Sequence, residues 1–168
     1  TSATRSPGTQ QMAELYLVRH AQASFHARDY DCLSALGEQQ SLWLGEHFAA
    51  RGIGFDALVT GTLRRHRQTL AGILAGMRRD PSAEPLVLPG LDEYDFRALV
   101  AAYAEANSAD PRVAQWRADP ASKPVFYRLL KLAMLDWAGQ RLPGPLPETW
   151  AGFRQRIEEA AAGLQALA

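Results

Sequence analysis

Three short apolar runs, separated by helical patterns, constrain the fold of this chain most. The runs are "LYLV" at 15–18, "FDALVT" at 55–60 and "PLVL" at 85–88. A continuous run rich in β-branched and aromatic residues is typical of a strand buried on both faces in a parallel sheet. The order strand, helix, strand, helix, strand predicts right-handed crossovers. We therefore expect an α/β fold with a doubly wound, mostly parallel sheet flanked by helices.

Helix signals fill the two gaps between these runs. Ser34 can cap a helix that reaches about Ala50, with Leu36, Trp43 and His47 on the face expected to be buried. Thr62 is placed to cap the second helix. At helical spacing between two leucines of that second helix, His66 is expected to pack in the core rather than bind a ligand, and the same is expected of His47.

The remaining segments fit one domain of 168 residues. Residues 94–147 are helical and aromatic, and we interpret them as a helical insertion over one end of the sheet. A final helix is expected from 150 to about 167. We assign 13–168 to the domain, and 1–12, which lacks the apolar middle of a secretory signal, to a flexible leader or cloning remnant.

Charge and cysteine content exclude several classes of partner. Lys plus Arg and Asp plus Glu each total 18, so no global field draws the chain to nucleic acid or to a membrane surface. Cys32 is the only cysteine, which fits a reducing, cytoplasmic compartment. No window reaches the length of a membrane span, and no spacing of ligand residues implies a metal or another cofactor.

Polar residues follow each of the three predicted strands. Arg19 and His20 come after the first, Arg65 after the second and Glu93 after the third. Ligands of open parallel sheets bind beyond the carboxyl ends of the strands, so we expect these side chains to converge. Guanidinium groups beside a helix N-terminus suit a phosphate.

These residue types predict phosphoryl transfer. His20 is placed as the nucleophile, with one ring nitrogen facing phosphorus while the other donates a hydrogen bond that fixes the tautomer. Arg19 and Arg65 would bind the transferring oxygens, and Glu93 would protonate the leaving oxygen. The simpler alternatives are a surface pair for Arg19 and His20, a solvated Arg65, and a loop carboxylate for Glu93.

Four motifs in the same order resemble landmarks of the histidine phosphatase superfamily, also called phosphoglycerate mutase-like. They are "LVRHAQ", with alanine in place of the family's glycine after the histidine, "LSALGEQQ", "TGTLRRHRQT" and "LDEYDF". The resemblance implies the family's α/β fold and a phosphohistidine intermediate on His20. Gln22, Ser24 and His26 are further candidates for the pocket, although His26 could simply belong to the loop.

Two departures from the family pattern matter. The mutases carry a tryptophan-asparagine pair where this chain has Phe25 and His26, and the stretch after Glu93 differs as well, which favours a phosphatase. The family's second histidine belongs to a strand that would follow the last helix, so we expect the natural chain to extend past Ala168. A homodimer is the alternative way to cover the exposed edge of the first strand.

We therefore expect a phosphatase that hydrolyses small phosphomonoesters without a cofactor. A mutase, which returns the phosphoryl group to a bound alcohol, is one alternative. A binding or regulatory protein that holds a phosphorylated ligand without turnover is the other, and the absent second histidine supports it. The sequence does not identify the substrate.

Overall fold

The computed structural model describes residues 13–24 and 31–167. Contacts between residues group the chain into two compact units. The first unit comprises the chain up to Pro89 together with the segment from Ala161 onward, and the second unit is Gly90–Ala160. The expected leader at 1–12 lies outside the described residues, as does His26.

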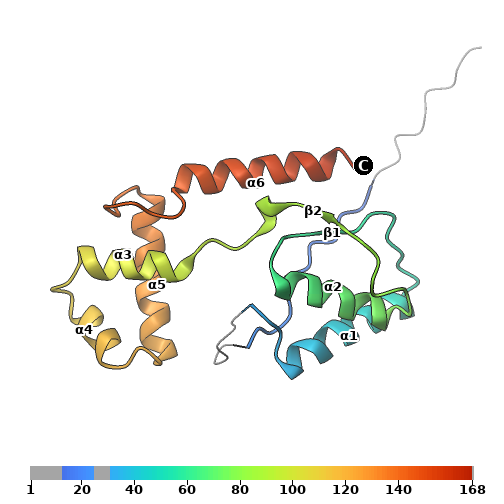
Figure 1. Cartoon of the computed structure of the whole chain (residues 1–168), viewed down its shortest axis with the longest axis horizontal. Helices are drawn as coiled ribbons and strands as arrows, with labels where there is room; N and C mark the ends of the chain where they lie inside the picture. The colour runs from blue at the N-terminus through green and yellow to red at the C-terminus, as the bar shows by residue number, and fades with distance from the viewer. Residues whose placement is uncertain (1–12, 25–30, 168) are drawn as a thin grey trace, which may run out of the picture. The chain divides into compact units, whose positions relative to one another are not determined.

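The first unit contains a small parallel sheet and two helices (Figure 1). Its elements are α1 (Ala35–Ala50), β1 (Val59–Thr60), α2 (Arg64–Gly76) and β2 (Leu86–Val87). β1 pairs with β2 in parallel, with Val59 opposite Leu86 and Thr60 opposite Val87. Both strands lie inside the predicted runs but are shorter than predicted. The parallel pairing and the intervening helix agree with the expected α/β class.

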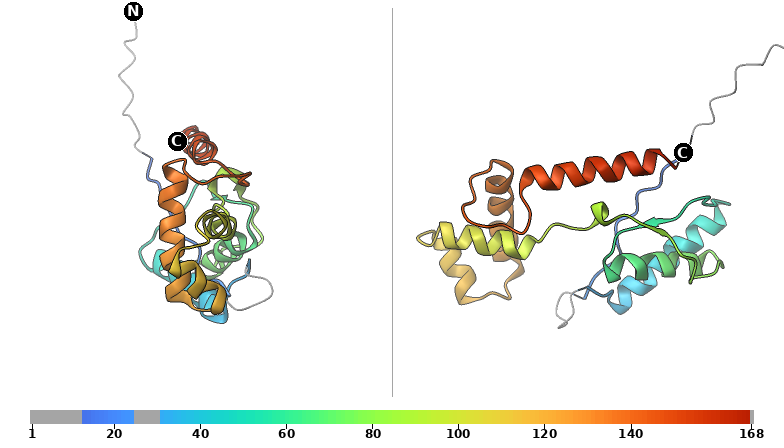
Figure 2. Two further views of the ribbon diagram at one scale, coloured as in Figure 1. Left: turned by 90° about the vertical axis from the view of Figure 1, so that its left-hand side faces the viewer. Right: turned by 45° about the horizontal axis from the view of Figure 1, so that its top comes forward.

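Small residues bring α1 and α2 into close contact, and the two helices run side by side in Figures 1 and 2. A Cβ added at Gly45 would overlap the Ile73 carbonyl oxygen, and one added at Gly76 would overlap the Leu42 carbonyl oxygen. The backbones therefore approach each other more closely than larger side chains would allow. This contact fixes α2, whose first turn carries Arg65.

We expect Gly45→Ala to lower the free energy of unfolding by about 1–3 kcal/mol, because the methyl group must push the two backbones apart. Thermal unfolding measures the change, with Gly54→Ala as the matched control, since nothing lies within 4 Å of an added Cβ there. Equal melting temperatures for the two variants would show that the helices are not closely packed at Gly45.

The buried face of α1 differs from the predicted one. Leu36 and Trp43 are exposed, and so is His47, so the prediction that His47 packs in the core is wrong. The helix instead buries Gly37, Ser41, Gly45 and Phe48. Close helix contact selects small residues here, and a pattern based on side-chain hydrophobicity does not detect them.

Residues 15–18 form no strand in the described structure. Leu15 is 62% exposed and Leu17 is 78% exposed, whereas the Tyr16 ring packs edge-on against Phe48 and Phe55. A strand buried on both faces needs neighbours on both faces and along both edges. Among the described residues of this run, Tyr16 packs its ring against other aromatic rings, while Leu15 and Leu17 remain exposed. The prediction of a buried strand is therefore wrong for the described structure.

The second unit is helical, as expected for 94–147. The chain enters it through the 3₁₀ turn η1 (Pro89–Leu91), and its helices are α3 (Phe96–Ala106), α4 (Pro111–Ala118), α5 (Lys123–Ala138) and most of α6 (Trp150–Gln165). The Asp95 carboxylate caps α3 by accepting two backbone N–H groups of the first turn, and Asp110 caps α4 by accepting one. α6 matches the predicted final helix. No helix among residues 13–24 and 31–167 is long and apolar enough to cross a membrane.

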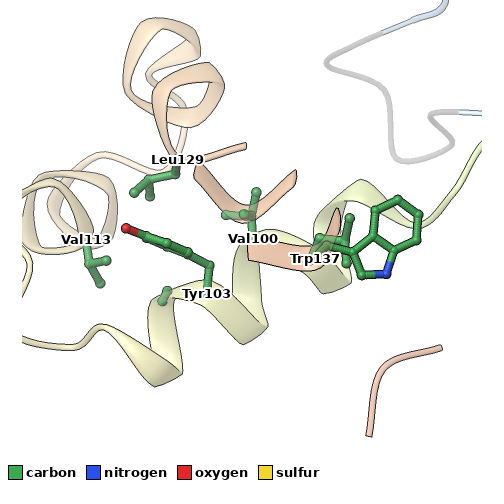
Figure 3. Packing of buried hydrophobic residues seen from close by; sticks show 8 residues of the cluster. Val100, Tyr103, Val113, Leu129 and Trp137 are labelled. Carbon is green, nitrogen blue, oxygen red and sulfur yellow. The ribbon is translucent and has the colours of Figure 1, made fainter. Parts of the chain in front are cut away.

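A compact apolar core joins α3, α4 and α5. Figure 3 shows the Tyr103 ring of α3 pointing toward Val113 of α4 and Leu129 of α5. Val113 and Leu129 are fully buried, and so is Val100. Most of the aromatic residues in this unit therefore have packing roles, whereas Tyr127 is exposed.

Candidate active site

His20 lies at the start of the loop that follows the first apolar run, and it is half-buried. Its Nδ1 lies 2.7 Å from the Ala21 carbonyl oxygen. A carbonyl oxygen can only accept, so Nδ1 is the donor, and in the neutral imidazole Nε2 then carries the lone pair. This is the tautomer that a nucleophilic imidazole requires.

Motif residues of α2 hold this loop in place. The backbone N–H of Ala21 donates to Thr69 Oγ1 at 3.1 Å, and the Thr69 hydroxyl donates to the Arg65 carbonyl oxygen at 2.8 Å. The N–H of Leu33 donates to Gln68 Oε1 at 2.9 Å. Gln68 and Thr69 thus connect the His20 segment to the helix that carries Arg65.

The motif at the start of α1 supports the other side of the loop. The N–H of Gln22 donates to Gln40 Oε1 at 3.0 Å. The Ser34 hydroxyl donates to Gln22 Oε1 at 2.8 Å and accepts the Gly37 N–H at 3.1 Å, which confirms Ser34 as the cap of α1. A Cβ at Gly37 would overlap the Gln22 carbonyl oxygen, so only glycine allows this approach.

Of the three further pocket candidates, Gln22 and Ser24 are hydrogen-bonded to the segment that leads into α1. The Ser24 hydroxyl donates to the Leu33 carbonyl oxygen at 3.0 Å, and the Ser24 N–H donates to the Cys32 carbonyl oxygen at 2.9 Å. Both side chains therefore shape the loop beside His20. His26, the third candidate, lies outside the described residues.

Arg65 is a buried cation, with its side chain only 5% exposed. Its Nη1 donates to Asp31 Oδ1 at 3.0 Å. The Asp31 carboxylate also accepts the backbone N–H groups of Arg64 at 2.8 Å and Arg65 at 3.3 Å. Asp31 therefore caps α2, and the predicted cap by Thr62 is wrong: Leu63 occupies the N-cap position without a side-chain hydrogen bond.

The ionised form of Asp31 is stabilised by its surroundings. Partial burial on its own would raise the pKa of this carboxyl group. The N–H donors of Arg64 and Arg65 and the Arg65 guanidinium outweigh that effect, so the pKa of Asp31 lies below its usual value. A carboxylate of the protein itself thus occupies the helix N-terminus where the sequence predicts a bound anion.

His66 is the second imidazole beside His20. The two rings are inclined by 30°, with their centroids 5.8 Å apart, and His66 is half-buried on the first turn of α2. The expectation of a fully packed core histidine is therefore not met. The sequence could have indicated that His66 lies near the site, because His66 follows Arg65 directly and the start of α2 faces the His20 loop.

Arg19 and Glu93 complete the predicted set. Both side chains are exposed. Glu93 belongs to the second unit, where Arg156 of α6 anchors its loop by donating from Nη1 to the carbonyl oxygens of Gly90 at 2.9 Å and Asp92 at 2.7 Å. Arg156 also forms a two-pronged ion pair with Glu148. One guanidinium therefore holds the backbone that leads into Glu93.

Within the first unit, the structure brings together His20, His66 and the first turn of α2 with Arg65 and Asp31. Sequence reasoning missed Asp31, because its contacts are with residues 33 and 34 positions further along the chain. Among residues 13–24 and 31–167, no three His, Cys, Asp or Glu side chains are grouped so that they could hold a metal ion. The arrangement places the His20 imidazole beside the helix turn that carries a buried guanidinium.

Comparison with known proteins identifies the family. A family model of the histidine phosphatase superfamily (branch 1) matches residues 15–168, so the chain belongs to this superfamily. The broad-specificity phosphatase YOR283W of Saccharomyces cerevisiae (strain ATCC 204508 / S288c) is 31% identical over 72 residues, which are 39% of this chain. The match covers 31% of the length of that curated relative. No solved structure matches at a significant level. The family implies a phosphoglycerate mutase-like α/β fold, with which the parallel β1–β2 pair agrees.

Proposed function

We propose that this protein is a phosphatase that hydrolyses small phosphomonoesters through a phosphohistidine on His20. The observation that carries the proposal is the hydrogen bond from His20 Nδ1 to the Ala21 carbonyl oxygen, because it leaves Nε2 as the nucleophilic atom. Family membership and the similarity to a broad-specificity phosphatase support phosphatase-type chemistry.

The reaction has two displacements at phosphorus. His20 Nε2 attacks, the bond between phosphorus and the ester oxygen breaks, and Glu93 donates a proton to the leaving alcohol. Water then attacks the phosphohistidine, the phosphorus–nitrogen bond breaks, and inorganic phosphate leaves while Glu93 regains a proton. Arg19 and Arg65 stabilise the oxygens that carry charge in both transition states.

The test is product analysis with the natural full-length protein and a panel of phosphorylated metabolites. A phosphatase releases inorganic phosphate from several of them. Isomerised phosphoester without free phosphate would identify a mutase instead. Thermal stabilisation by the ligands without any turnover would identify a binding protein.

Glu93→Gln should slow hydrolysis of an alkyl phosphate such as glycerol phosphate by about a hundredfold or more, and hydrolysis of p-nitrophenyl phosphate by less than about tenfold. A good leaving group needs little proton donation, whereas an alkoxide needs a full proton. Values of kcat/KM for the two substrates measure the difference. Glu105→Gln, at an exposed position on α3, is the control. Equal losses on both substrates would assign Glu93 a structural or positioning role.

A further inference from the structure

Asp31 accepts hydrogen bonds from three donors at the start of α2, in the candidate site. Its carboxylate accepts from Arg65 Nη1 at 3.0 Å and from the backbone N–H groups of Arg64 and Arg65. One side chain therefore binds both the guanidinium and the backbone of the turn that carries it. This restricts the Arg65 side chain and the start of α2 together.

The burial of Arg65 makes such a partner necessary. Burial of a guanidinium without a counter-charge is unfavourable, and removal of one member of a buried ion pair is strongly destabilising. The Asp31 side chain, 35% exposed, supplies this charge to the Arg65 side chain, which is 5% exposed. Because Asp31 offsets part of the charge of Arg65, the value of Arg65 to a phosphoryl group depends on where its guanidinium nitrogens are held.

We propose that Asp31 is a positioning residue that holds Arg65 in the orientation needed to bind the transferring phosphoryl oxygens. The proposal rests on the phosphatase function proposed above. It assigns Asp31 no contact with the substrate. An arrangement of donors that is fixed before the reaction loses no free energy to reorientation during it, and a displacement of about 1 Å can cost about a hundredfold in rate.

The opposite interpretation is that Asp31 competes with phosphate for Arg65 and the helix N-terminus. The two interpretations predict opposite effects of removing the charge. A positioning residue makes turnover slower when it is lost, whereas a competitor makes phosphate bind more tightly when it is lost.

The experiment is a double-mutant cycle in the full-length protein with Asp31→Asn, Arg65→Lys and the double variant. Asparagine keeps an oxygen that can accept the N–H groups of α2, and it removes the charge. We expect Asp31→Asn to lower kcat/KM for p-nitrophenyl phosphate about ten- to a hundredfold, and to add less than about threefold in the Arg65→Lys background. Asp31→Glu, which restores the charge, should recover part of the loss.

Asp110 provides a matched control. It caps α4, accepts the N–H of Arg112 at 2.9 Å and pairs with the Arg112 guanidinium at 2.6 Å, so within the second unit it has the same two kinds of partner as Asp31. The pKa of Asp110 is lowered to about 2, chiefly by the hydrogen bond from the Arg112 side chain. Asp110→Asn should lower the melting temperature and leave kcat/KM within about twofold of the parent value.

Three outcomes would overturn the proposal. Unchanged kcat/KM in Asp31→Asn, together with a strong loss in Arg65→Lys, would reject positioning and leave the phosphatase function intact. Tighter binding of inorganic phosphate to Asp31→Asn would show competition. Full turnover in both Arg65→Lys and His20→Ala would reject the proposed function itself, and the role of Asp31 with it.

Discussion

His20→Ala is expected to lower kcat at least about a thousandfold, because water would have to attack the phosphoester directly in place of the imidazole. The fold should remain, since the side chain is half-buried at the start of a loop and its hydrogen bond goes to the neighbouring residue Ala21. Initial rates with p-nitrophenyl phosphate and thermal unfolding of the same sample measure both effects.

The matched control for this substitution is His47→Ala. His47 is exposed in the last turn of α1, in the same compact unit as His20. It should keep both the activity and the melting temperature of the parent. Turnover by His20→Ala within about tenfold of the parent would contradict a histidine nucleophile at this position.

Arg65→Lys should lower kcat/KM on the order of a hundred- to a thousandfold, although the positive charge remains. A guanidinium can bind two phosphoryl oxygens at once and keeps a fixed planar geometry, whereas an ammonium group offers a single point of charge. Arg65→Ala should be less stable as well, because it removes the ion pair between Arg65 and Asp31. Steady-state kinetics and thermal unfolding separate the two losses.

Arg67→Lys is the neighbouring control, since Arg67 is exposed on α2 and donates to the Thr62 carbonyl oxygen. We expect its kinetics to match the parent. If Arg65→Lys also stays within about threefold of the parent, Arg65 has a structural role only, and the phosphoryl oxygens are bound elsewhere.

Local signals in the sequence predicted the starts of α1 and α6 correctly. Ser34 caps α1 because its hydroxyl reaches a backbone N–H only three residues along the chain. The corresponding prediction for Thr62 is wrong because Asp31 caps α2. Asp31 lies 33 residues before Arg64 in the chain, so only the fold brings the two together. Tertiary capping of this kind has no short-range pattern.

The sequence predicted which side of a helix or strand is buried less accurately than it predicted where the helices and strands lie. Trp43 has the size and apolarity of a core residue, yet the contact between α1 and α2 is made through Gly45 and Gly76, where backbone meets backbone. For the run at 15–18, apolar composition indicates a preference for burial, but strand formation also requires a partner for each N–H and C=O group. Composition does not determine that partner.

The candidate site follows the sequence motifs closely. Gln68 and Thr69 prove to anchor the loop that carries His20, through a bond to the Leu33 N–H and a bond to the Ala21 N–H. The motifs therefore include residues that join the His20 loop to α2. Assignment of roles needed the hydrogen bonds of the folded chain.

The most direct test of the account is to trap the covalent intermediate. The natural full-length protein would be mixed with a radiolabelled phosphomonoester, quenched in alkali within one turnover, and digested for peptide mapping by mass spectrometry. We predict a label that is stable in alkali, labile in acid and located on the peptide that contains His20, and no label in His20→Ala. Release of inorganic phosphate without any labelled protein, or a label on a peptide that lacks His20, would contradict the mechanism.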